Sequence, residues 1–589
     1  MQSYPSNGRI QQVFLLDRCC RSFLYRYIIA KELHNSSASA NAITPKIKNR
    51  GELFVNKLDL SDIKDRLLPK MLTLQAQQNG SGEFLITDER RLTFAEAEQE
   101  ANIIASGLRA LGVSKGDRVS FYLDDAVNIV LIALAANKIG AVWVPINTDY
   151  KGAWLAETLE RSRSKVLITE TALQERVLDV ASSLKDERRV VIGAESDITL
   201  PDAITFDALR DHAPLVPDYS DMHYGDTCAV LWTSGTTGKS KGVLQSHNAW
   251  VRPVESSSYY KTREGDVIYN VLPLYNSGAW ITAVFRALYE GIPVVLEKRF
   301  SVTTFWDRVR HFGATQTFTL GAMHIFLWNA PAQPNDKDHP LRIAQMIPMP
   351  EALLKPFSER FDVELLPMGY GQSEAMVIGS TANAIGKVPF SSLGLPLDDM
   401  ELALLDDDNQ PVPVGEVGEI CIRCLKPHII FNGYFDDESA TASAYTGDWY
   451  HTGDLGRLDG NGAYWFVDRK RDALRYAGRN LSTMEVEMVV RKHPDVKDVA
   501  AFGVPSKEVE SESELKINVV LKPDAKVTYE AMAKFINDNA PYYFVPQYME
   551  FVETLPYTPN NKVQKFRLRE LGITPQTWSL KQSEYKVKR

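Results

Sequence analysis

Short blocks of apolar residues alternate with longer amphipathic stretches along most of this chain, and this rhythm predicts strands separated by helices. The helical spacing from Arg91 to about Leu111 predicts an amphipathic helix, and Thr93 with Glu96 three residues later predicts a capping box. Further predicted elements are a buried helix at 126–139 and strands at 117–122, 141–145, 165–169, 267–272 and 292–296. Strands that alternate with helices favour crossover units on a largely parallel sheet, so the expected fold class is α/β.

The first 50 residues differ in composition from the rest of the chain. They carry several arginines and a Ser/Asn/Ala tract, but a single acidic residue, Asp17, before Glu32. This composition resembles a mitochondrial transit peptide, and a disordered N-terminal extension is the equal alternative. Residues 1–55 are therefore left out of the fold prediction. We expect a cytoplasmic protein, or a mitochondrial one if this segment is a transit peptide.

Composition and charge narrow the possible functions. A length of 589 residues exceeds one ordinary core and predicts several domains. The balance of 44% hydrophobic and 24% charged residues is typical of globular proteins. A net charge of -9 argues against a nucleic-acid partner, because binding the phosphate backbone requires a basic face. The longest apolar run, 129–136, is far shorter than the ~20 residues of a spanning helix, so no integral membrane segment is expected.

The five cysteines do not suggest a disulfide framework, because two of them are adjacent, and they indicate a reducing compartment. Cys421 and Cys424 form an isolated C-x-x-C within the strand-like run 419–425. Residues three apart on a strand face opposite sides, and no second pair completes a metal site. Strand packing is therefore the favoured role for these two cysteines.

The stretch from Thr233 to Gly242 has a composition suited to holding phosphate. Glycines let backbone N–H groups approach an anion, hydroxyl groups add donors and lysines add charge. These residues are Gly235, Gly238 and Gly242, then Thr233, Ser234, Thr236 and Thr237, and finally Lys239 and Lys241. Apolar runs on both sides predict that the loop joins two strands. The loop fails the Walker A pattern at Thr233, where a glycine is required, and a plain surface turn is the alternative.

Three later stretches supply the remaining parts of a nucleotide site. Met368–Glu374 contains Tyr370, whose ring can stack on a base, and Glu374, whose carboxylate can hold a hard cation. Tyr450–Asp454 presents a carboxylate after a tight turn, suited to sugar hydroxyls. An irregular Pro/Asn segment, typical of a mobile loop, presents Lys562. A base platform, a ribose acceptor, a phosphate loop and a loop lysine together predict an ATP site.

With these motifs in this order, the sequence resembles the adenylate-forming superfamily of acyl-CoA synthetases, firefly-type luciferases and peptide-synthetase adenylation domains. The resemblance runs from about residue 56 to about residue 572. It includes the phosphate loop and the Y-G-x-T-E, T-G-D, G-R-x-K/D and G-K-[VI]-x-[KR] patterns of that family. These match at Thr233–Gly242, Tyr370–Glu374, Thr452–Asp454, Asp468–Arg471 and Asn561–Lys565.

The resemblance implies a two-step ligase that uses ATP, Mg²⁺ and CoA with a small-molecule carboxylic acid. The acid attacks the α-phosphate of ATP to give an acyl-adenylate and pyrophosphate, and a thiol then displaces AMP. Because two anions must meet, the site needs cations and preorganised donors at the phosphate. Lys562, Glu374 and Ser373 are implied as catalytic residues, with Glu374 as the metal ligand. The implied ATP-binding residues are Thr233, Ser234, Gly235, Thr236, Thr237, Gly238, Lys239, Lys241, Tyr370, Gly371, Gln372, Asp454 and Arg469.

The resemblance also implies a large N-terminal domain at 56–470 and a small mobile α/β domain at 471–589, which rotates about Arg471. Residues implied in CoA binding are Ala477, Gly478 and Arg479, with Arg475 and Lys565 adding charge. Residues implied in the acyl pocket are Asn276, Trp280 and Gly321. The identity of the acid and the oligomeric state are not indicated.

Several positions depart from the family patterns. Asn561 replaces the usual glycine before the implied catalytic lysine, and Asn276 replaces a histidine beside the acyl channel. The small-residue stretch G-G-A-P is Gln345–Pro350 here, and its bulkier side chains are expected to reshape the adenine or acyl pocket. An enzyme that loads a carrier protein, or a catalytically weak nucleotide-binding scaffold, stays open as an alternative. Trp280, Gly321–His324 and the tail 541–546 are most similar to carnitine/crotonobetaine–CoA ligases.

Overall fold

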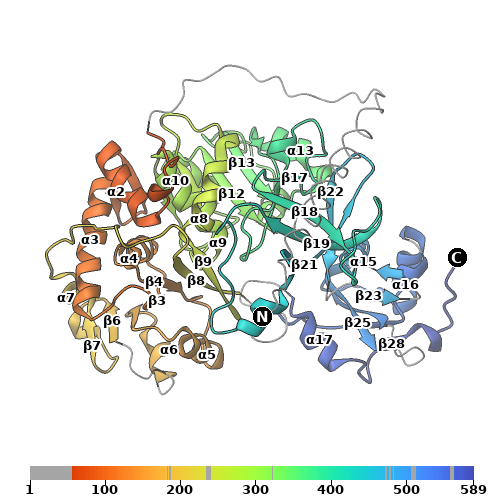
Figure 1. The fold of residues 1–589 in the computed structure, drawn as a ribbon. Helices are drawn as coiled ribbons and strands as arrows, with labels where there is room; N and C mark the ends of the chain where they lie inside the picture. Colours follow the sequence, from red (N-terminus) through yellow and green to blue (C-terminus); the bar gives the residue numbers. More distant parts are fainter. Residues whose placement is uncertain are drawn as a thin grey trace, which may run out of the picture.

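A computed structural model describes residues 56–181, 184, 188–233, 240–321, 323–470, 474–476, 479–481, 483–505, 513–540, 542–557 and 563–588. The chain forms a large α/β body that ends with strand β22 (Tyr464–Arg469), and a smaller α/β unit follows it, blue in Figure 1. The predicted α/β class is therefore confirmed. The domain boundary between residues 470 and 471 stays a prediction, since residues 471–473 lie outside the described residues.

One sheet of the large body contains three of the predicted strands, and it is almost entirely parallel. In spatial order its strands are β7 (Ala203–Thr205), β6 (Arg188–Ile192), β5 (Val166–Glu170), β3 (Arg118–Tyr122), β4 (Val142–Pro145), β8 (Thr227–Thr233) and β9 (Lys241–Ser246). Neighbours pair in parallel except β8 and β9, which pair antiparallel. The predicted phosphate loop therefore joins two adjacent strands, as expected, rather than leading into a helix.

The second sheet repeats this arrangement with the two other predicted strands. Its spatial order is β14 (Glu364–Leu365), β13 (Ile343–Ile347), β12 (Gln316–Leu320), β10 (Ile268–Asn270), β11 (Val294–Leu296), β1 (Glu83–Ile86) and β2 (Arg91–Thr93). Only the β1–β2 pair is antiparallel. The parallel crossover architecture predicted from the alternation of strands and helices is confirmed in both sheets.

The predicted amphipathic helix begins slightly later than expected. Residues 91–93 form strand β2, and helix α3 (Phe94–Ala110) starts after it. Thr93 accepts a hydrogen bond from the Glu96 N–H, and the Glu96 carboxylate accepts one from the Thr93 N–H at 2.8 Å. The capping box is therefore present as predicted.

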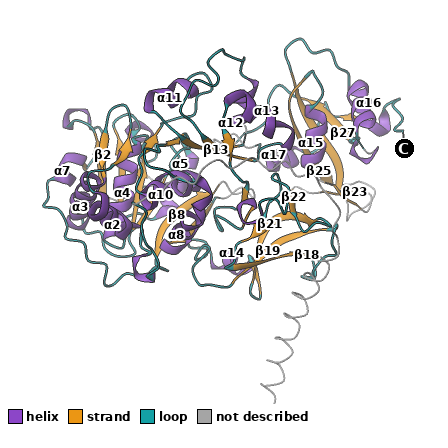
Figure 2. Ribbon diagram, turned by 90° about the horizontal axis from the view of Figure 1, so that it is seen from above, coloured by secondary structure: helices purple, strands orange, loops and turns teal. Residues whose placement is uncertain are grey.

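Helix α4 (Ala126–Lys138) lies within the main core, and all of its residues are buried. Its last residue, Lys138, places its ammonium 2.7 Å from a Glu98 carboxylate oxygen, because a buried charge needs a partner. Figure 2 shows α4 gathered with α2 (Leu68–Asn79), α3 and α10 (Phe285–Glu290) at one end of the molecule. Other helices of the large body are α5 (Ala153–Ser162), α6 (Gln174–Leu178), α7 (Phe206–Arg210), α8 (His247–Glu255), α9 (Ser277–Ala279), α11 (Phe305–Phe312), α12 (Met323–Asn329), α13 (Glu351–Phe361) and α14 (Glu438–Ser443).

Two smaller sheets complete the large body beside the site. The longer one contains β18 (Met400–Leu405), β19 (Val417–Cys424), β21 (Trp449–Leu458), β20 (Tyr445–Thr446) and β22. The shorter one contains β15 (Gly369–Tyr370), β16 (Gly379–Ser380) and β17 (Leu395–Pro396). Because β19 includes both Cys421 and Cys424, the strand predicted for that C-x-x-C is confirmed.

The C-terminal unit has its own sheet and core. Its sheet contains β25 (Val496–Pro505), β26 (Ser513–Leu521), β27 (Tyr548–Phe551) and β28 (Trp578–Ser579), beside a hairpin of β23 (Leu474–Tyr476) and β24 (Arg479–Leu481). Its helices are α15 (Thr483–Arg491), α16 (Tyr529–Asn539) and α17 (Lys565–Leu571). Asp468 on β22 accepts hydrogen bonds from the Thr483 N–H at 2.7 Å and the Thr483 hydroxyl at 2.9 Å. This carboxylate therefore links the large body to the first helix of the C-terminal unit.

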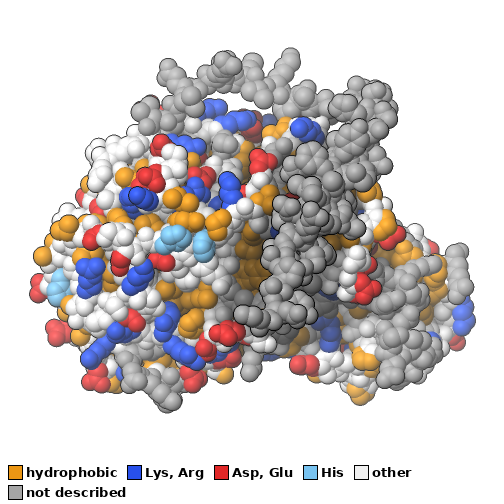
Figure 3. Space-filling view, viewed as in Figure 1, with side chains coloured by type: hydrophobic (Ala, Val, Ile, Leu, Met, Phe, Trp, Pro, Cys, Tyr) orange, Lys and Arg blue, Asp and Glu red, His pale blue; other side chains and the backbone are white. Residues whose placement is uncertain are grey.

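Three further expectations concern the N-terminal segment, membrane-spanning helices and the charge of the surface. The N-terminal segment 1–55 lies outside the described residues, so the transit-peptide hypothesis stays a prediction. In the described part of the chain, no helix has both the length and the apolar character needed to cross a bilayer. Figure 3 shows acidic and basic side chains interspersed over one face of the large body, without a continuous basic patch on that face.

Close packing between α3 and α7 generates a stability prediction. A Cβ atom added at Gly107 would lie 1.9 Å from the Leu209 carbonyl oxygen. We expect Gly107→Ala to destabilise the large body by about 2 kcal/mol, because overpacking outweighs the gain in helix propensity. Differential scanning calorimetry measures the shift. Gly460→Ala is the matched control, since nothing lies within 4 Å of its added Cβ. Equal midpoints for the two variants would contradict the close packing.

Candidate active site

A cavity of about 810 Å³ lies in the large body, and its walls come from segments far apart in the sequence. They include β8, β9, α8, the helical turn η4 (Ser256–Tyr260), residues 275–282, β12, β13, residues 369–377, β19, β21 and residues 469–470. The residues predicted from the sequence that line it are Thr233, Lys241, Asn276, Tyr370, Gly371, Gln372, Ser373, Glu374 and Arg469. The fold thus brings together residues that the motifs had connected only by their order.

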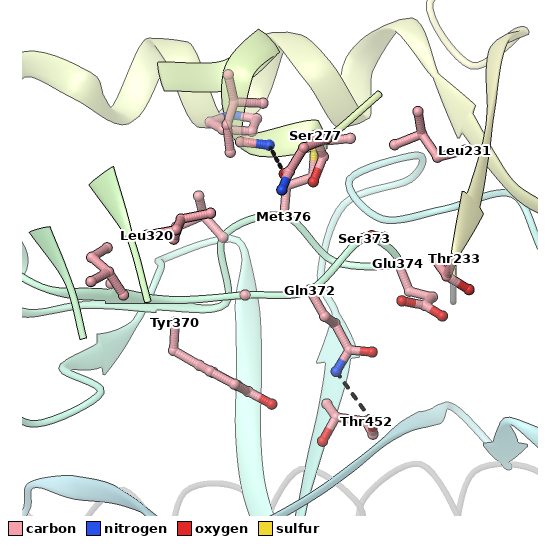
Figure 4. Close-up of a pocket in the computed structure, with 18 of the residues that line it drawn as sticks. Leu231, Thr233, Ser277, Leu320, Tyr370, Gln372, Ser373, Glu374, Met376 and Thr452 are labelled. Atoms are coloured by element: carbon pink, nitrogen blue, oxygen red, sulfur yellow. Dashed lines mark hydrogen bonds between the residues drawn. The ribbon is translucent and has the colours of Figure 1, made fainter. Parts of the chain in front are cut away.

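The segment after β15 reverses direction very tightly at the centre of this cavity. The Gln372 N–H donates to the Ala375 carbonyl at 2.9 Å, and the Ile378 N–H donates to the Tyr370 carbonyl at 2.7 Å. A Cβ at Gly371 would lie 2.0 Å from the Met376 carbonyl oxygen, so only glycine fits. In Figure 4 the Tyr370 and Gln372 side chains point to one side of this segment, and Met376 lies on the other.

Tyr370, Asp454 and Arg469 form a connected group at one end of the cavity. The Tyr370 hydroxyl donates to Asp454 Oδ2 at 2.6 Å, and Arg469 Nε lies 3.3 Å from Asp454 Oδ1. Burial, followed by the neighbouring Asp454 carboxylate, raises the pKa of Tyr370 well above its ordinary value. Tyr370 therefore stays a neutral donor to the Asp454 carboxylate, which is 3% exposed.

Glu374 lies at the end of the cavity where β8 and β9 stop. The Tyr434 hydroxyl donates to Glu374 Oε1 at 2.9 Å, and the Lys241 ammonium lies 4.5 Å from the Tyr434 ring centre. Burial and the Glu374 carboxylate raise the pKa of Tyr434. In Figure 4 the Glu374 carboxylate points toward Thr233, the last residue of β8. Oxygen donors and a lysine thus meet at the mouth of the predicted phosphate loop.

Arg161, a residue that the sequence analysis did not single out, contacts both ends of that loop. Its guanidinium donates to the Ser240 carbonyl at 2.6 Å and lies 4.8 Å from the ring centre of Trp232. Trp232 comes directly before the loop and Ser240 lies near its end, so one side chain contacts both of its arms. No local pattern predicts this contact, because Arg161 lies on α5, 79 residues away from Ser240. Residues 234–239 themselves lie outside the described residues.

Gln372 and Ser373 are fixed by contacts to neighbouring strands. The Tyr450 hydroxyl donates to Gln372 Oε1 at 3.0 Å, and Gln372 Nε2 donates to the Thr452 carbonyl at 3.1 Å, which Figure 4 marks. The Gln245 amide donates to the Ser373 carbonyl. The turn is therefore connected to both β21 and β9.

The most buried end of the cavity contains the Gln345 departure. Gln345 Oε1 accepts from the Tyr260 hydroxyl at 2.6 Å, and Gln345 Nε2 donates to the Pro367 carbonyl at 2.7 Å and to the Tyr259 hydroxyl at 3.3 Å. Asn276 lines the same cavity, and its Oδ1 accepts from the Gly278 N–H at 2.9 Å as the cap of α9. Both departures thus have local partners.

The structure corrects part of the expectation for the bulky stretch Gln345–Pro350. Gln345 and Ile347 line the cavity, whereas Met346 and Met349 are buried in the core on the other side of β13. Side chains alternate across a strand, so neighbouring residues face opposite sides. The two methionines therefore fill the core and do not enlarge the cavity wall.

Two residues expected in the acyl pocket are placed elsewhere. Trp280 is fully buried, packs 4.5 Å from the Trp143 ring centre and donates its indole N–H to the Leu274 carbonyl at 2.7 Å. Leu320 is among the described residues that line the cavity. Trp280 and the exposed Gly321 are not among them. A large aromatic beside a motif can belong to the core as well as to a pocket, and sequence spacing does not separate these cases.

The structure describes only some of the functional residues predicted in the C-terminal unit. Lys562, Arg471, Ala477 and Gly478 lie outside the described residues, and Arg479 is described as backbone of β24 alone. Lys565, expected to add charge for CoA, is instead 12% exposed and lies 2.8 Å from Glu487 Oε1. It also donates to the Thr483 hydroxyl at 2.7 Å, so in this arrangement it stabilises the C-terminal unit.

A cluster that the sequence did not reveal borders the cavity on β19 and β21. His451 Nδ1 lies 2.9 Å from Glu419 Oε2 and 3.3 Å from Cys421 Sγ. Three such ligand types could hold a metal ion, but the Lys470 ammonium already lies 3.0 Å from Glu419 Oε2. Burial raises the pKa of Cys421 to about 12, so its thiol stays protonated. Lys470 balances the charge of Glu419, and Cys421 lies on β19; the strand-packing role of Cys421 stays a prediction.

Comparison with protein-family models gives two matches. Residues 72–435 match the AMP-binding enzyme model, and residues 485–562 match the AMP-binding enzyme C-terminal domain model. Among curated proteins, the chain is 30% identical to a crotonobetaine/carnitine–CoA ligase of Salmonella agona (strain SL483), over 82% of this chain and 93% of that protein. It is 31% identical to the protein of the same name from Escherichia coli O9:H4 (strain HS), over 81% and 93% respectively.

Solved structures with the same fold agree with these matches. An O-succinylbenzoate coenzyme A synthetase of Bacillus subtilis, in complex with ATP and magnesium ion, superposes with a TM-score of 0.72 at 25% identity. The match covers 85% of this chain and 98% of that one. An anthranilate CoA ligase in complex with anthranoyl-AMP superposes with a TM-score of 0.75 at 24% identity, over 86% and 97% respectively.

The cysteines on β19 generate a prediction about reactivity. Burial raises the pKa of Cys424 to about 11, and this residue is only partly buried. Because the thiolate is the reactive form, we expect Cys424 alkylation by iodoacetamide at pH 8 to be roughly a hundredfold slower in the folded protein than in the denatured chain. Its rate should rise about tenfold for each pH unit between 7 and 9.

Peptide mass spectrometry measures this rate for each cysteine. Cys421, which is fully buried, is the internal control and should remain unmodified throughout. A folded-state rate for Cys424 equal to that of the denatured chain would contradict the raised pKa.

Proposed function

The chain belongs to the AMP-binding enzyme family, and on that premise we propose that it is an ATP-dependent, AMP-forming carboxylate–CoA ligase. One observation carries this proposal. A single cavity is bordered by the ends of the phosphate-loop strands, by Glu374, by the Tyr370–Asp454–Arg469 group and by a buried end that has room for an organic acid. An enzyme that joins ATP to a carboxylate needs these parts in one enclosed space.

The proposed reaction has two steps. In the first, a carboxylate oxygen of the acid bonds to the α-phosphorus of ATP, and the bond to the β-phosphate breaks with release of pyrophosphate. In the second, the CoA sulfur bonds to the acyl carbon as its proton leaves, and the bond to AMP breaks. Both steps concentrate negative charge, so they depend on positive groups and N–H donors that are fixed in advance.

We propose one role for each group at the nucleotide end of the cavity. The Tyr370 ring would contact adenine, and Asp454 would accept from the ribose hydroxyls. Arg469 already lies beside Asp454 and would balance its charge or that of the phosphate. The loop from Thr233 to Gly242 would hold the β- and γ-phosphates, with Lys241 at its end. This arrangement leaves the α-phosphate between the loop and the buried end of the cavity.

The Glu374 end fits a hard cation such as Mg²⁺. Its donors are carboxylate and hydroxyl oxygens from Glu374 and Thr233, and Mg²⁺ prefers oxygen ligands. Mg²⁺ bound there would neutralise phosphate charge. Tyr434 donates to one oxygen of the Glu374 carboxylate, which leaves the other oxygen for a cation.

The thiol step is proposed to require rotation of the C-terminal unit about Arg471. Ala477, Gly478 and Arg479 would then approach CoA, and Lys562 would act in the first step by bridging the acid and the α-phosphate. These roles rest on the motif matches, since the side chains concerned lie outside the description.

Lys562→Ala tests the first step. We expect pyrophosphate exchange driven by a suitable acid to fall about 100-fold or more, because one preorganised charge at the reacting phosphate is lost. The matched control is Lys534→Ala, an exposed lysine of the same unit that pairs with Asp538. Release of AMP that depends on free CoA then separates a CoA ligase from an enzyme that loads a carrier protein. Absence of exchange in the parent protein with all acids of a broad panel would support a scaffold instead.

Arg161→Ala tests the proposed phosphate loop. Loss of the hydrogen bond from the charged Arg161 guanidinium to the Ser240 carbonyl, of about 1.5 kcal/mol, should loosen the loop and raise the KM for ATP about tenfold, with a smaller change in kcat. Arg163→Ala is the control, because Arg163 is exposed and pairs with Asp436. Steady-state kinetics with varied ATP measures both. Equal ATP KM values for the two variants would show that Arg161 does not position the loop.

A further inference from the structure

The buried end of the cavity is polar but carries no carboxylate among the described residues that form it. Its walls come from Ser256, Tyr259, Tyr260, Thr282, Phe318, Leu320, Gln345 and Ile347. The acidic residues that line the cavity, Glu374 and Glu419, belong to the nucleotide end, where Tyr434 and Lys470 contact them. An acyl tail that enters the buried end therefore meets hydroxyl, amide and apolar groups.

A buried ion pair lies directly behind this wall. The Arg286 guanidinium, 1% exposed, lies 3.7 Å from the centre of the Tyr260 ring. It donates to the Thr282 carbonyl at 2.8 Å and to Gln316 Oε1 at 2.6 Å. Its carboxylate partner is Glu290, at 3.3 Å. Burial raises the pKa of Tyr259; the Gln345 amide and the Arg286 cation act against that rise, and the Glu290 carboxylate adds to it. Both members of the ion pair therefore act at the cavity wall, with opposite signs.

The two tyrosine rings at this end already have partners. The Tyr259 and Tyr260 rings stack with their centres 4.8 Å apart, and the guanidinium contacts Tyr260. A quaternary ammonium group is normally recognised by open aromatic faces or by a carboxylate. Here the Tyr260 ring already contacts one cation, and that cation is neutralised by Glu290, so this pair leaves no net negative charge to compensate a second buried cation.

The wall offers acceptors to a tail that carries a donor. The Thr282 hydroxyl donates to the Gly278 carbonyl at 2.7 Å, and the Ser256 hydroxyl donates to the Pro253 carbonyl at 2.9 Å. A hydroxyl that donates to a carbonyl still has lone pairs to accept with. Phe318 and Leu320 supply the apolar surface for a carbon skeleton.

From this distribution of charge we infer that the acid activated by this protein has an electrically neutral tail with a hydroxyl or N–H donor, and that a quaternary ammonium tail is rejected. The inference rests on the proposed ligase function, because it assigns the substrate class of the same cavity. It separates this chain in specificity from relatives that are named for betaine-type acids.

Three acids of nearly equal shape test the inference through CoA-dependent AMP release. They are γ-butyrobetaine, its carbon analogue 5,5-dimethylhexanoate, and 5-hydroxy-5-methylhexanoate. We expect kcat/KM for the carbon analogue to exceed that for γ-butyrobetaine at least tenfold, or about 1.4 kcal/mol. The hydroxy acid should react at least as efficiently as the carbon analogue. A value for γ-butyrobetaine equal to or above that of the carbon analogue would overturn the inference, and a tenfold disadvantage of the hydroxy acid would overturn the donor assignment.

Two variants at one position separate charge from shape. Gln345→Glu adds a carboxylate at the buried wall and should move the preference at least tenfold toward γ-butyrobetaine. Gln345→Met is the matched control, because it removes the amide without adding charge, and it should leave the preference for the neutral tail in place. An unchanged preference in Gln345→Glu would show that the acyl tail does not reach this wall.

Binding of unreactive analogues makes the result independent of turnover. Acyl-sulfamoyl adenosines with the same three tails can be compared by isothermal titration calorimetry on the full chain. If none of the three acids supports AMP release, the exchange assay with the broad panel decides the ligase function, and tighter binding of the neutral analogues still supports the tail preference of the cavity. Equal or tighter binding of the trimethylammonium analogue, or no binding by any analogue, would overturn it.

Discussion

The chain reverses direction between Tyr370 and Ile378 because no side chain stands at Gly371, where a Cβ would meet the Met376 carbonyl oxygen at 2.0 Å. This close approach determines where the two ends of the cavity lie. Before the reversal, Tyr370 reaches Asp454 on β21, and after it Met376 lines the opposite side. Between them, the Glu374 carbonyl accepts from the Phe431 N–H at 2.8 Å, so the segment that follows β19 is attached to the same turn.

A second arginine holds the turn from the direction of α8. Arg252, 5% exposed, makes two hydrogen bonds to the Asp399 carboxylate, at 2.6 and 2.7 Å, and a third to the Val377 carbonyl at 2.6 Å. A buried ion pair adds little net stability, but it disfavours other arrangements, because separating it leaves an unpaired buried charge. With Arg161 at the phosphate-loop strands, two arginines outside the reacting groups thus restrict the shape of the cavity.

Local patterns in the sequence were sufficient for much of the fold. The Thr93–Glu96 capping box, the buried α4 and the parallel strands follow from periodicity and end signals, which depend only on neighbouring residues. The strand–loop–strand form of the phosphate loop followed in the same way. The motif residues at Tyr370, Glu374 and Arg469 also meet in one cavity, since their order along the chain was characteristic.

The features that could not be predicted from the sequence depend on contacts between residues far apart in the chain. Arg161 donates to the Ser240 carbonyl, 79 residues away, and no local sequence pattern predicts such a contact. Trp280 was expected in the pocket, but it is buried in the core. The alternation of side chains on β13 would have separated Gln345 from Met346 had its register been known. The contact between Arg286 and the Tyr260 ring is likewise made across the fold, and Arg286 itself does not line the cavity.

The Asp468 carboxylate has a consequence for any large motion of the C-terminal unit. It is 1% exposed and accepts from the Thr483 N–H and hydroxyl and from the Met484 N–H at 3.4 Å, although Asp468 itself is paired with β21 of the large body. A rotation about the intervening residues would have to break these bonds and expose the carboxylate to water. If the unit does rotate, the strength of these hydrogen bonds would set the fraction of molecules in the present arrangement and the rate at which they leave it.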